Sequence, residues 1–199
     1  MKKIKISNII HIKALLEGDS DVMCRAIKAV LDGDTRTPWW LICITSGTGF
    51  PILRPHRMKL LNCQGILPVA FDDLIPIPKY WEKNNGKEPV WEDLIEYTYL
   101  MPRSHHMPEI LQVINSVGEN EKLVVNCEAG VSRSAAVAYF AALQWGLVPD
   151  EIFNRDMYSP NNLVSALLRD ASGMTPFKES WDMLLKNPKK RNPWGDETR

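Results

Sequence analysis

The sequence lacks a long apolar run and an excess of charge of either sign, and each absence excludes a class of protein. No stretch approaches the roughly 20 apolar residues that a membrane-spanning helix needs. Lys13, Glu17 and Asp19 interrupt any signal-peptide core behind the basic start of the chain. Lys plus Arg equals Asp plus Glu, at 24 each, so no overall charge attracts nucleic acid or a membrane. We therefore expect a cytoplasmic protein that binds neither.

Cysteine is also scarce, and its spacing shows no pattern. Four cysteines in 199 residues do not make a disulfide framework, so we expect reduced thiols. There is no internal repeat and no low-complexity tract, and the hydrophobic fraction of 45% is that of an ordinary globular protein. The length predicts one domain over residues 1–186, followed by a disordered tail over 187–199.

Apolar runs alternate with helical patterns along the chain, which predicts an α/β fold. Strands are expected at 39–45, at 67–71 and from residue 122, and helices at 108–117, 149–157 and 161–171. Residues 90–100 also have helical spacing and are interpreted as part of an insertion over about 76–101. The expected architecture is a central, mostly parallel, twisted sheet flanked by helices.

The most informative stretch is residues 122–134, which combine a short buried strand, Cys127, small residues, Arg133 and a helix. Such a turn directs backbone N–H groups at one point, and the following helix adds the positive end of its dipole. This arrangement suits a phosphate-sized dianion. A thiol at its centre is expected to be a nucleophilic thiolate, because helix N-termini and Arg stabilise that form.

The context of Cys127 supports this interpretation over chance. Cys127 is the one cysteine with an Arg six residues later. Gly130 permits an unusual backbone conformation and close approach to a ligand. Ser132 or Ser134 is expected to cap the next helix, and Gly146 to end it. The alternative is a buried structural cysteine before a core helix, with an incidental Arg.

The run Cys-Glu-Ala-Gly-Val-Ser-Arg-Ser at 127–134 resembles the signature Cys-x-x-Gly-x-x-Arg-[Ser/Thr] of the cysteine-dependent protein phosphatases. It is most similar to the compact dual-specificity and protein-tyrosine-phosphatase-like group, including small microbial members. Residues 40–45, 67–73 and 158–161 resemble further segments of that group. The resemblance implies a protein-tyrosine-phosphatase-like fold, with the phosphate-binding loop between a strand and a helix.

The resemblance also implies roles for individual residues. Cys127 would attack phosphorus and form a phospho-cysteine that water then hydrolyses. Arg133 would hold two phosphoryl oxygens in a bidentate fork, and Ser134 would stabilise the thiolate as it leaves. The backbone of the loop would bind the remaining oxygens; the phosphate-binding residues are Glu128, Ala129, Gly130, Val131, Ser132 and Arg133.

The leaving alcohol needs a proton, and a carboxylic acid on a loop normally supplies it. Asp72 and Asp73 follow the strand expected at 67–71. Asp73 is favoured because the second Asp better matches the acid position of the family, while Asp72 stays an alternative. Both could also be a plain polar strand end. The long spacing from Asp73 to Cys127 is attributed to the insertion at about 76–101.

The predicted function is hydrolysis of phosphate monoesters, on phosphotyrosine and phosphoserine or phosphothreonine of proteins or on small molecules. No cofactor and no metal are expected, because His105 and His106 have no further ligands at a familiar spacing. The sequence does not define an oligomeric state.

One departure from the family motivates the alternatives. The family usually has His immediately before the nucleophile, where this chain has Asn126. A catalytically weak phospho-binding module is therefore the second hypothesis. A thiol-redox enzyme of the arsenate-reductase type is the third, with Cys63 or Cys43 as the resolving cysteine.

Overall fold

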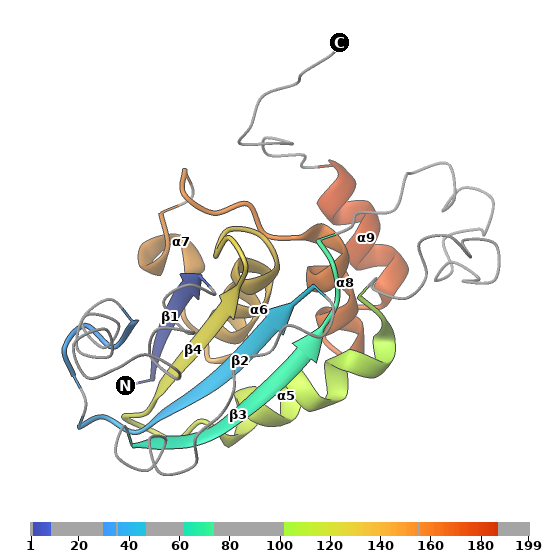
Figure 1. Ribbon diagram of the computed structural model, residues 1–199. Helices are drawn as coiled ribbons and strands as arrows, with labels where there is room; N and C mark the ends of the chain where they lie inside the picture. The colour runs from blue at the N-terminus through green and yellow to red at the C-terminus, as the bar shows by residue number, and fades with distance from the viewer. Residues whose placement is uncertain are drawn as a thin grey trace.

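The computed structural model describes residues 2–8, 30–34, 36–46, 62–73, 102–154 and 156–186. Its centre is a four-stranded sheet in the order β1-β4-β2-β3, in which every neighbouring pair is parallel. The strands are β1 (Lys3–Asn8), β2 (Trp39–Thr45), β3 (Cys63–Ala70) and β4 (Lys122–Cys127). Their carboxyl ends therefore point the same way, toward one edge of the sheet (Figure 1).

Helices cover the sheet and one another. Helix α6 (Arg133–Gln144) packs on β1 and β4, and α5 (Met107–Ser116) packs on β2 and β3. Helix α8 (Asn162–Ala171) contacts both of them, and α9 (Phe177–Lys186) packs on α8. The short helices are η2 (Ser104–His106), which leads into α5, and α7 (Pro149–Ile152). The described elements thus form the sheet and helix layers of an α/β fold (Figure 1).

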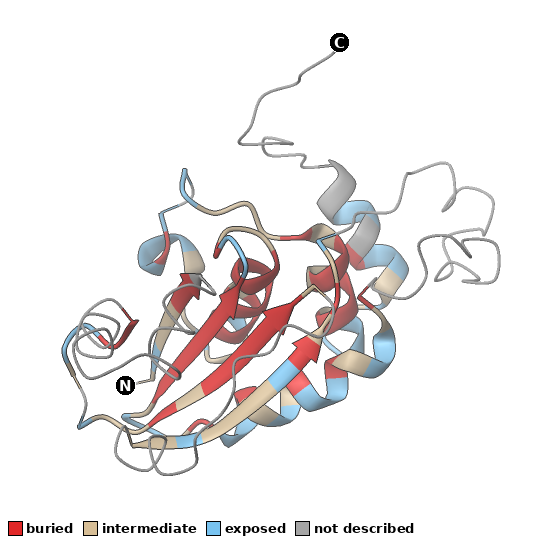
Figure 2. Ribbon diagram, viewed as in Figure 1, coloured by how far each residue is buried: buried red, intermediate tan, exposed pale blue. Residues whose placement is uncertain are grey.

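The two central strands are buried on both faces. Side chains alternate along a strand, and Ile42, Leu123 and Val125 join the core that α5, α6 and α8 build. Their neighbours Leu41 and Val124 point to the other face and are also fully buried. Continuous apolar runs are typical of strands in parallel sheets, because both faces are covered (Figure 2).

Helix α6 lies at the centre of the structure because its side chains are small. Five alanines of α6 are fully buried, which lets the helix approach the sheet closely. Gly146 ends the helix, as predicted, with φ of 70°. The N–H of Gly146 donates to Leu143 and that of Leu147 to Ala142, the pair of bonds that satisfies the last carbonyls of a helix.

The expected α/β sheet, the strand at 39–45 and the helices near 108–117 and 161–171 are confirmed. Strand β3 begins at Cys63, four residues before the prediction, because Gly65 interrupts the strand pattern in the sequence. That glycine lies under the Trp40 ring, where a Cβ would come within 2.7 Å of a ring carbon. The close approach explains why a glycine stands inside a strand.

Two helix predictions need correction. The helix expected over 149–157 ends at Ile152, because Phe153 becomes extended and its ring stacks on Tyr139 with centroids 4.9 Å apart. Helix α9 was not predicted. The helical pattern at 90–100, the insertion at about 76–101 and the tail at 187–199 lie outside the described residues.

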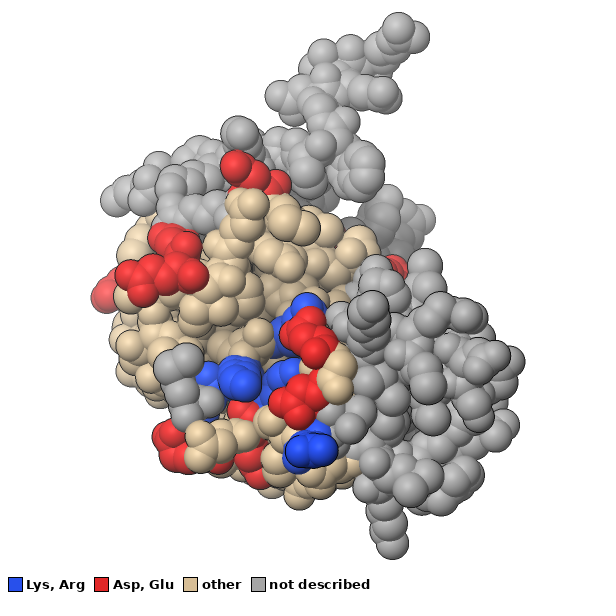
Figure 3. All heavy atoms as spheres, turned by 90° about the vertical axis from the view of Figure 1, so that its left-hand side faces the viewer, with Lys and Arg blue, Asp and Glu red and all other residues tan. Residues whose placement is uncertain are grey.

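Charged side chains of both signs lie side by side on the face that carries β1 (Figure 3). Lys5 on β1 and Asp32, for example, form an ion pair of 2.9 Å. Within the described ranges, no helix combines the length and apolar character that crossing a membrane requires.

His106 is a titratable group packed into the fold. Its ring lies against Phe71, with centroids 5.4 Å apart, and its Nδ1 accepts a hydrogen bond from the Arg103 N–H at 3.1 Å. Burial, and then the charges of His105 and Arg103, lower the pKa of His106 from 6.5 to about 4. Between these values the unfolded chain binds a proton that the folded chain does not. Stability therefore falls as the pH drops through this window.

We predict that the free energy of unfolding falls by about 1 to 3 kcal/mol between about pH 7 and about pH 4 because of His106, the range allowing for its partial exposure. His106→Asn keeps an acceptor for the Arg103 N–H but does not titrate, so it should remove this part of the pH dependence. Urea unfolding at several pH values measures the effect. His105→Asn is the matched control, and an equal effect of both variants would contradict the assignment.

Candidate active site

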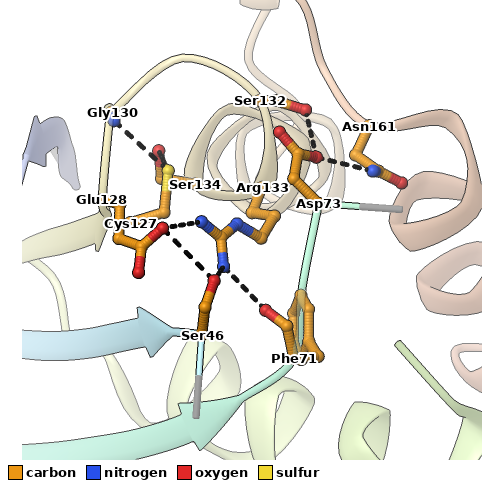
Figure 4. A network of polar contacts seen from close by, with 10 residues as sticks. All are labelled: Ser46, Phe71, Asp73, Cys127, Glu128, Gly130, Ser132, Arg133, Ser134 and Asn161. Atoms are coloured by element: carbon orange, nitrogen blue, oxygen red, sulfur yellow. Dashed lines mark hydrogen bonds and ion pairs between the residues drawn. The ribbon is translucent and has the colours of Figure 1, made fainter. Parts of the chain in front are cut away.

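The candidate active site lies at the carboxyl ends of three neighbouring strands. Ser46 follows β2, Asp73 comes shortly after β3, and Cys127 is the last residue of β4. Because the strands are parallel, these positions meet at one edge of the sheet, where open α/β sheets bind ligands. Figure 4 shows their side chains around the signature loop, residues 127–133.

The thiol of Cys127 lies inside the signature loop and is surrounded by donors. Cys127 is 2% exposed. The Gly130 N–H donates to its Sγ at 3.3 Å, and the Ser134 hydroxyl lies 3.1 Å from the same atom. Gly130 has φ of 72°, which favours glycine and turns its N–H back toward the sulfur. Donors to sulfur stabilise a thiolate, so this environment suits a nucleophile.

Arg133 is a buried cation with partners from each of the three strand ends. Its Nη1 donates to the Ser46 hydroxyl at 2.9 Å and to the Phe71 carbonyl at 2.7 Å. Its Nη2 pairs with the Glu128 carboxylate at 3.0 Å. The Arg133 side chain is only 5% exposed, so these contacts compensate for its loss of hydration.

These contacts leave one edge of the Arg133 guanidinium available. The group has five N–H donors in a plane, and three are engaged by Ser46, Phe71 and Glu128. The buried Nε has no hydrogen-bond partner among the described residues. The Nε–H and the second N–H of Nη2 point in the same direction, which is the fork that binds two oxygens of a phosphoryl group.

Glu128 links the loop to the end of β2. Its Oε2 accepts from Arg133 and also from the Ser46 hydroxyl, at 3.2 Å. Partial burial alone would raise the pKa of the Glu128 carboxyl, but the hydrogen bonds and charge of Arg133 and the Ser46 hydroxyl together lower it. Glu128 is 51% exposed and ionised at neutral pH, so it partly neutralises the one cation of the loop.

Neither of the two serines that flank Arg133 makes the helix cap predicted from the sequence. Ser132 occupies the N-cap position of α6, but its side chain makes no capping hydrogen bond. Its hydroxyl donates to Asp73 instead, at 2.6 Å, and the Ser134 hydroxyl contacts the Cys127 thiol. The predicted cap is therefore wrong, because both hydroxyls are used within the site. No side chain of the loop takes the first N–H groups of α6 in the way a cap would, and such groups suit an anion.

The structure distinguishes the two carboxylates that follow β3. Asp73 Oδ1 accepts from Ser132 and, at 2.8 Å, from the Asn161 side-chain amide. Asp72 makes no hydrogen bond or ion pair with the described part of the chain. Asp73 is thus the carboxylate held against the signature loop, and its role as the acid stays a prediction.

The segment before α8 contacts the loop from the other side. The Ser159 N–H donates to the Val131 carbonyl at 3.1 Å, and the Asn161 N–H donates to the Ser132 carbonyl at 3.2 Å. These bonds fix the backbone of the loop. The sequence analysis did not assign a role to Ser46 or Asn161, since contacts with residues more than 25 positions away leave no local pattern.

Asn126 is fully buried, and neither atom of its amide has a hydrogen-bond partner among the described residues. Ser7 lies opposite it on β1, and its buried hydroxyl also lacks a partner in that part of the chain. The loop therefore adopts its shape without a hydrogen bond from the Asn126 side chain to the described residues. A buried polar group without a partner costs stability.

The other cysteines lie away from Cys127. Cys43 comes between Ile42 and Ile44, which share the core cluster with Cys127, so its side chain points to the opposite face of the sheet. Cys63 begins β3 at the far end of the sheet, about 20 Å from the loop at the usual rise per residue. Burial raises the pKa of Cys63 to about 12, which keeps it an unreactive thiol. Neither cysteine is placed to resolve an oxidised Cys127; Cys24 lies outside the described residues.

The rings of His105 and His106 lie against each other at a tilt of 48°, with centroids 4.1 Å apart. No group of three or more His, Cys, Asp or Glu side chains that could hold a metal ion occurs among the described residues. The site geometry involves a thiol, a guanidinium and carboxylates.

No protein-family model matches the chain, and no curated protein matches its sequence. Solved structures that resemble it include the following two. The human tyrosine phosphatase-like serine/threonine/tyrosine-interacting protein is 16% identical, with a TM-score of 0.38 and coverage of 81% of this chain and 87% of that one. PTPMT1 in complex with PI(5)P is 15% identical, with a TM-score of 0.35 and coverage of 81% and 86%. These are distant likenesses. The α/β sheet and the loop between β4 and α6 agree with the protein-tyrosine-phosphatase-like fold that the sequence resemblance implies.

Replacing Asn126 by Val should raise the free energy of unfolding by about 1 to 2 kcal/mol, because it removes a buried amide without a hydrogen-bond partner. Chemical denaturation measures the change. Val124→Asn, two residues earlier on the same buried face, is the mirror control and should destabilise the fold. A loss of stability in Asn126→Val would show that the amide is satisfied.

Glu128 should weaken the binding of inorganic phosphate to the loop, because it places a negative charge beside Arg133. Glu128→Gln keeps an acceptor for Nη2 but removes that charge, so phosphate should bind roughly 3- to 10-fold more tightly, as expected for a partly exposed charge. Calorimetric titration with phosphate measures this, with Glu109→Gln on the surface of α5 as the control. Weaker binding in Glu128→Gln would mean that the charge is needed to hold Arg133.

Proposed function

We propose that the protein is a phosphatase that hydrolyses phosphate monoesters through a phospho-cysteine at Cys127. The observation that carries the proposal is the free edge of the Arg133 guanidinium, where the buried Nε–H has no hydrogen-bond partner among the described residues. This edge belongs to the same loop as the Cys127 thiol, which is itself surrounded by hydrogen-bond donors. A bound phosphoryl group would suit both the free edge of Arg133 and the thiol of Cys127. It would accept the unpaired donors of Arg133 and of the loop backbone, and it would offer phosphorus to the sulfur.

The reaction proceeds in two displacements. The Cys127 thiolate attacks phosphorus, the P–O bond of the ester breaks, and the leaving oxygen takes a proton from Asp73. Water then attacks the phospho-cysteine and gives a proton to the Asp73 carboxylate. The P–S bond breaks, the Ser134 hydroxyl stabilises the departing thiolate, and phosphate leaves. Water is the only co-reactant, and Cys127 and Asp73 return to their starting forms.

The substrate class proposed is phosphotyrosine, with phosphoserine and phosphothreonine, on proteins. The loop offers Glu128 in place of a cation that would bind further phosphates. Glu128 and Asp73 are both exposed at the loop, so the described surface around it does not favour a polyanionic substrate. This argues against polyphosphorylated lipids and for a single phosphoryl group on a larger partner.

Two alternatives predict different behaviour. A phospho-binding module would bind phosphate or vanadate without turnover, and the replacement of the usual His by Asn126 is what favours it. A thiol-redox enzyme would need a second cysteine near Cys127, and the positions of Cys43 and Cys63 speak against that role for either of them.

Hydrolysis of p-nitrophenyl phosphate across about pH 5 to 8 tests the proposal. Cys127→Ser should abolish turnover, with Cys63→Ser as the matched control that retains it. On phenyl phosphate, whose basic leaving oxygen needs the proton, Asp73→Asn should lower kcat/KM by about 10²- to 10⁴-fold, the usual contribution of a general acid, while Asp72→Asn should leave it nearly unchanged.

Other results would redirect the assignment. Turnover in Cys127→Ser would exclude Cys127 as the nucleophile. No turnover by the native chain, with vanadate still bound, would favour the phospho-binding module. A greater loss in Asp72→Asn than in Asp73→Asn would exchange the roles of the two carboxylates.

A further inference from the structure

Two donors from different parts of the chain converge on one oxygen of Asp73. The Ser132 hydroxyl donates to Oδ1 at 2.6 Å, and the Asn161 amide donates to the same oxygen at 2.8 Å. Ser132 belongs to the signature loop and Asn161 precedes α8. The segment after β3, the loop and the start of α8 therefore meet at Oδ1, as Figure 4 shows.

The orientation of the Asn161 side chain is set by its other contacts. Its Oδ1 accepts from the Val164 N–H at 3.0 Å and caps α8. Its backbone N–H donates to the Ser132 carbonyl, and the residue is 1% exposed. Because the carbonyl end of the amide is committed to the helix, the NH₂ end has to face Asp73.

We propose that Asn161 is a positioning residue that, together with Ser132, reserves Oδ2 of Asp73 for the transferable proton. This inference rests on the proposed function, in which Asp73 is the general acid. An oxygen that already accepts two short hydrogen bonds has no lone pair left for a proton, so the acid proton resides on the other oxygen. Neither of the two hydrogen bonds that Figure 4 draws to Asp73 ends on Oδ2.

The same contacts serve both chemical steps. In the first, the proton passes from Oδ2 to the leaving oxygen as the P–O bond breaks, and Asp73 becomes a carboxylate. The hydrogen bonds from Ser132 and Asn161 then end on a charged acceptor, where such bonds are stronger. In the second, Oδ2 takes a proton from the attacking water, while Oδ1 keeps both donors. The carboxylate does not need to rotate between the steps.

The experiment compares two aryl phosphates in the full chain. Asn161→Asp keeps an oxygen to cap α8, but it removes the donor and places a carboxylate against Asp73. Phenyl phosphate releases a basic phenolate that needs the proton, whereas p-nitrophenyl phosphate releases a stable anion. We expect kcat/KM, which reports the first displacement, to fall by about 10- to 100-fold on phenyl phosphate and by less than about 3-fold on p-nitrophenyl phosphate.

Two further variants complete the test. Ser165→Ala removes a hydroxyl that donates to the Asn161 carbonyl at 3.0 Å without touching Asp73, so both rates should stay unchanged. Ser132→Ala removes the other donor to Oδ1 and should show the same selective loss as Asn161→Asp. If thermal unfolding shows that Asn161→Asp is not folded, the rates of Ser132→Ala alone test the proposal.

The outcomes separate this inference from the function on which it rests. An equal loss on both substrates, or no loss on either, in a folded Asn161→Asp and in Ser132→Ala would overturn the positioning role while leaving the phosphatase assignment intact. If the native chain hydrolyses neither substrate, the proposed function fails, and the role of Asn161 fails with it.

Discussion

The buried guanidinium of Arg133 is the group on which the arrangement of the site depends. An isolated charge in the interior costs several kcal/mol, so its position is stable only where enough acceptors surround it. Ser46, Phe71 and Glu128 supply these acceptors, and they follow β2, β3 and β4 respectively. The guanidinium thus joins three strand ends, and they in turn fix the direction of its free edge.

The fold makes this convergence possible. A parallel sheet brings its carboxyl ends to one edge, which places Ser46, Asp73 and Cys127 close together although they are far apart in sequence. The small side chains of α6 let that helix lie against β4, so that its first residues reach the loop. Asn161 then connects the loop to α8, and through Asp73 to the segment after β3. The packing of α6 and α8 therefore determines the geometry of the site.

The sequence predicted the parts of the site that are local. Cys127, Gly130 and Arg133 form one continuous turn, and its residue types predict the proposed chemistry without reference to the rest of the chain. The preference for Asp73 over Asp72 as the acid came from the resemblance and stays a prediction, and the structure adds the contacts of Asp73 with the loop. The α/β class followed from alternating strand and helix patterns, which depend on periods of a few residues.

What the sequence did not predict depends on tertiary contacts. Ser46 has no local signature, and although Asn161 caps α8 locally, its contact with Asp73 joins atoms 88 positions apart, as that of Ser46 with Glu128 joins atoms 82 positions apart. The serine cap failed because the Ser132 hydroxyl is turned toward Asp73, to which it donates, and so does not accept from the first N–H groups of its own helix. Helix 149–157 was cut short because Phe153 packs into the core rather than continuing the turn. In each case long-range packing overrode a local preference.

The central claim is that the loop between β4 and α6 directs a phosphoryl group onto the sulfur of Cys127. The most direct measurement is rapid acid quenching during turnover of p-nitrophenyl phosphate, followed by mass spectrometry of the peptide that contains residues 122–134. The account predicts a peptide phosphorylated at Cys127, formed as fast as nitrophenol is released and absent from Cys127→Ser. Nitrophenol release with no phosphorylated peptide, or with phosphate on another residue, would contradict it.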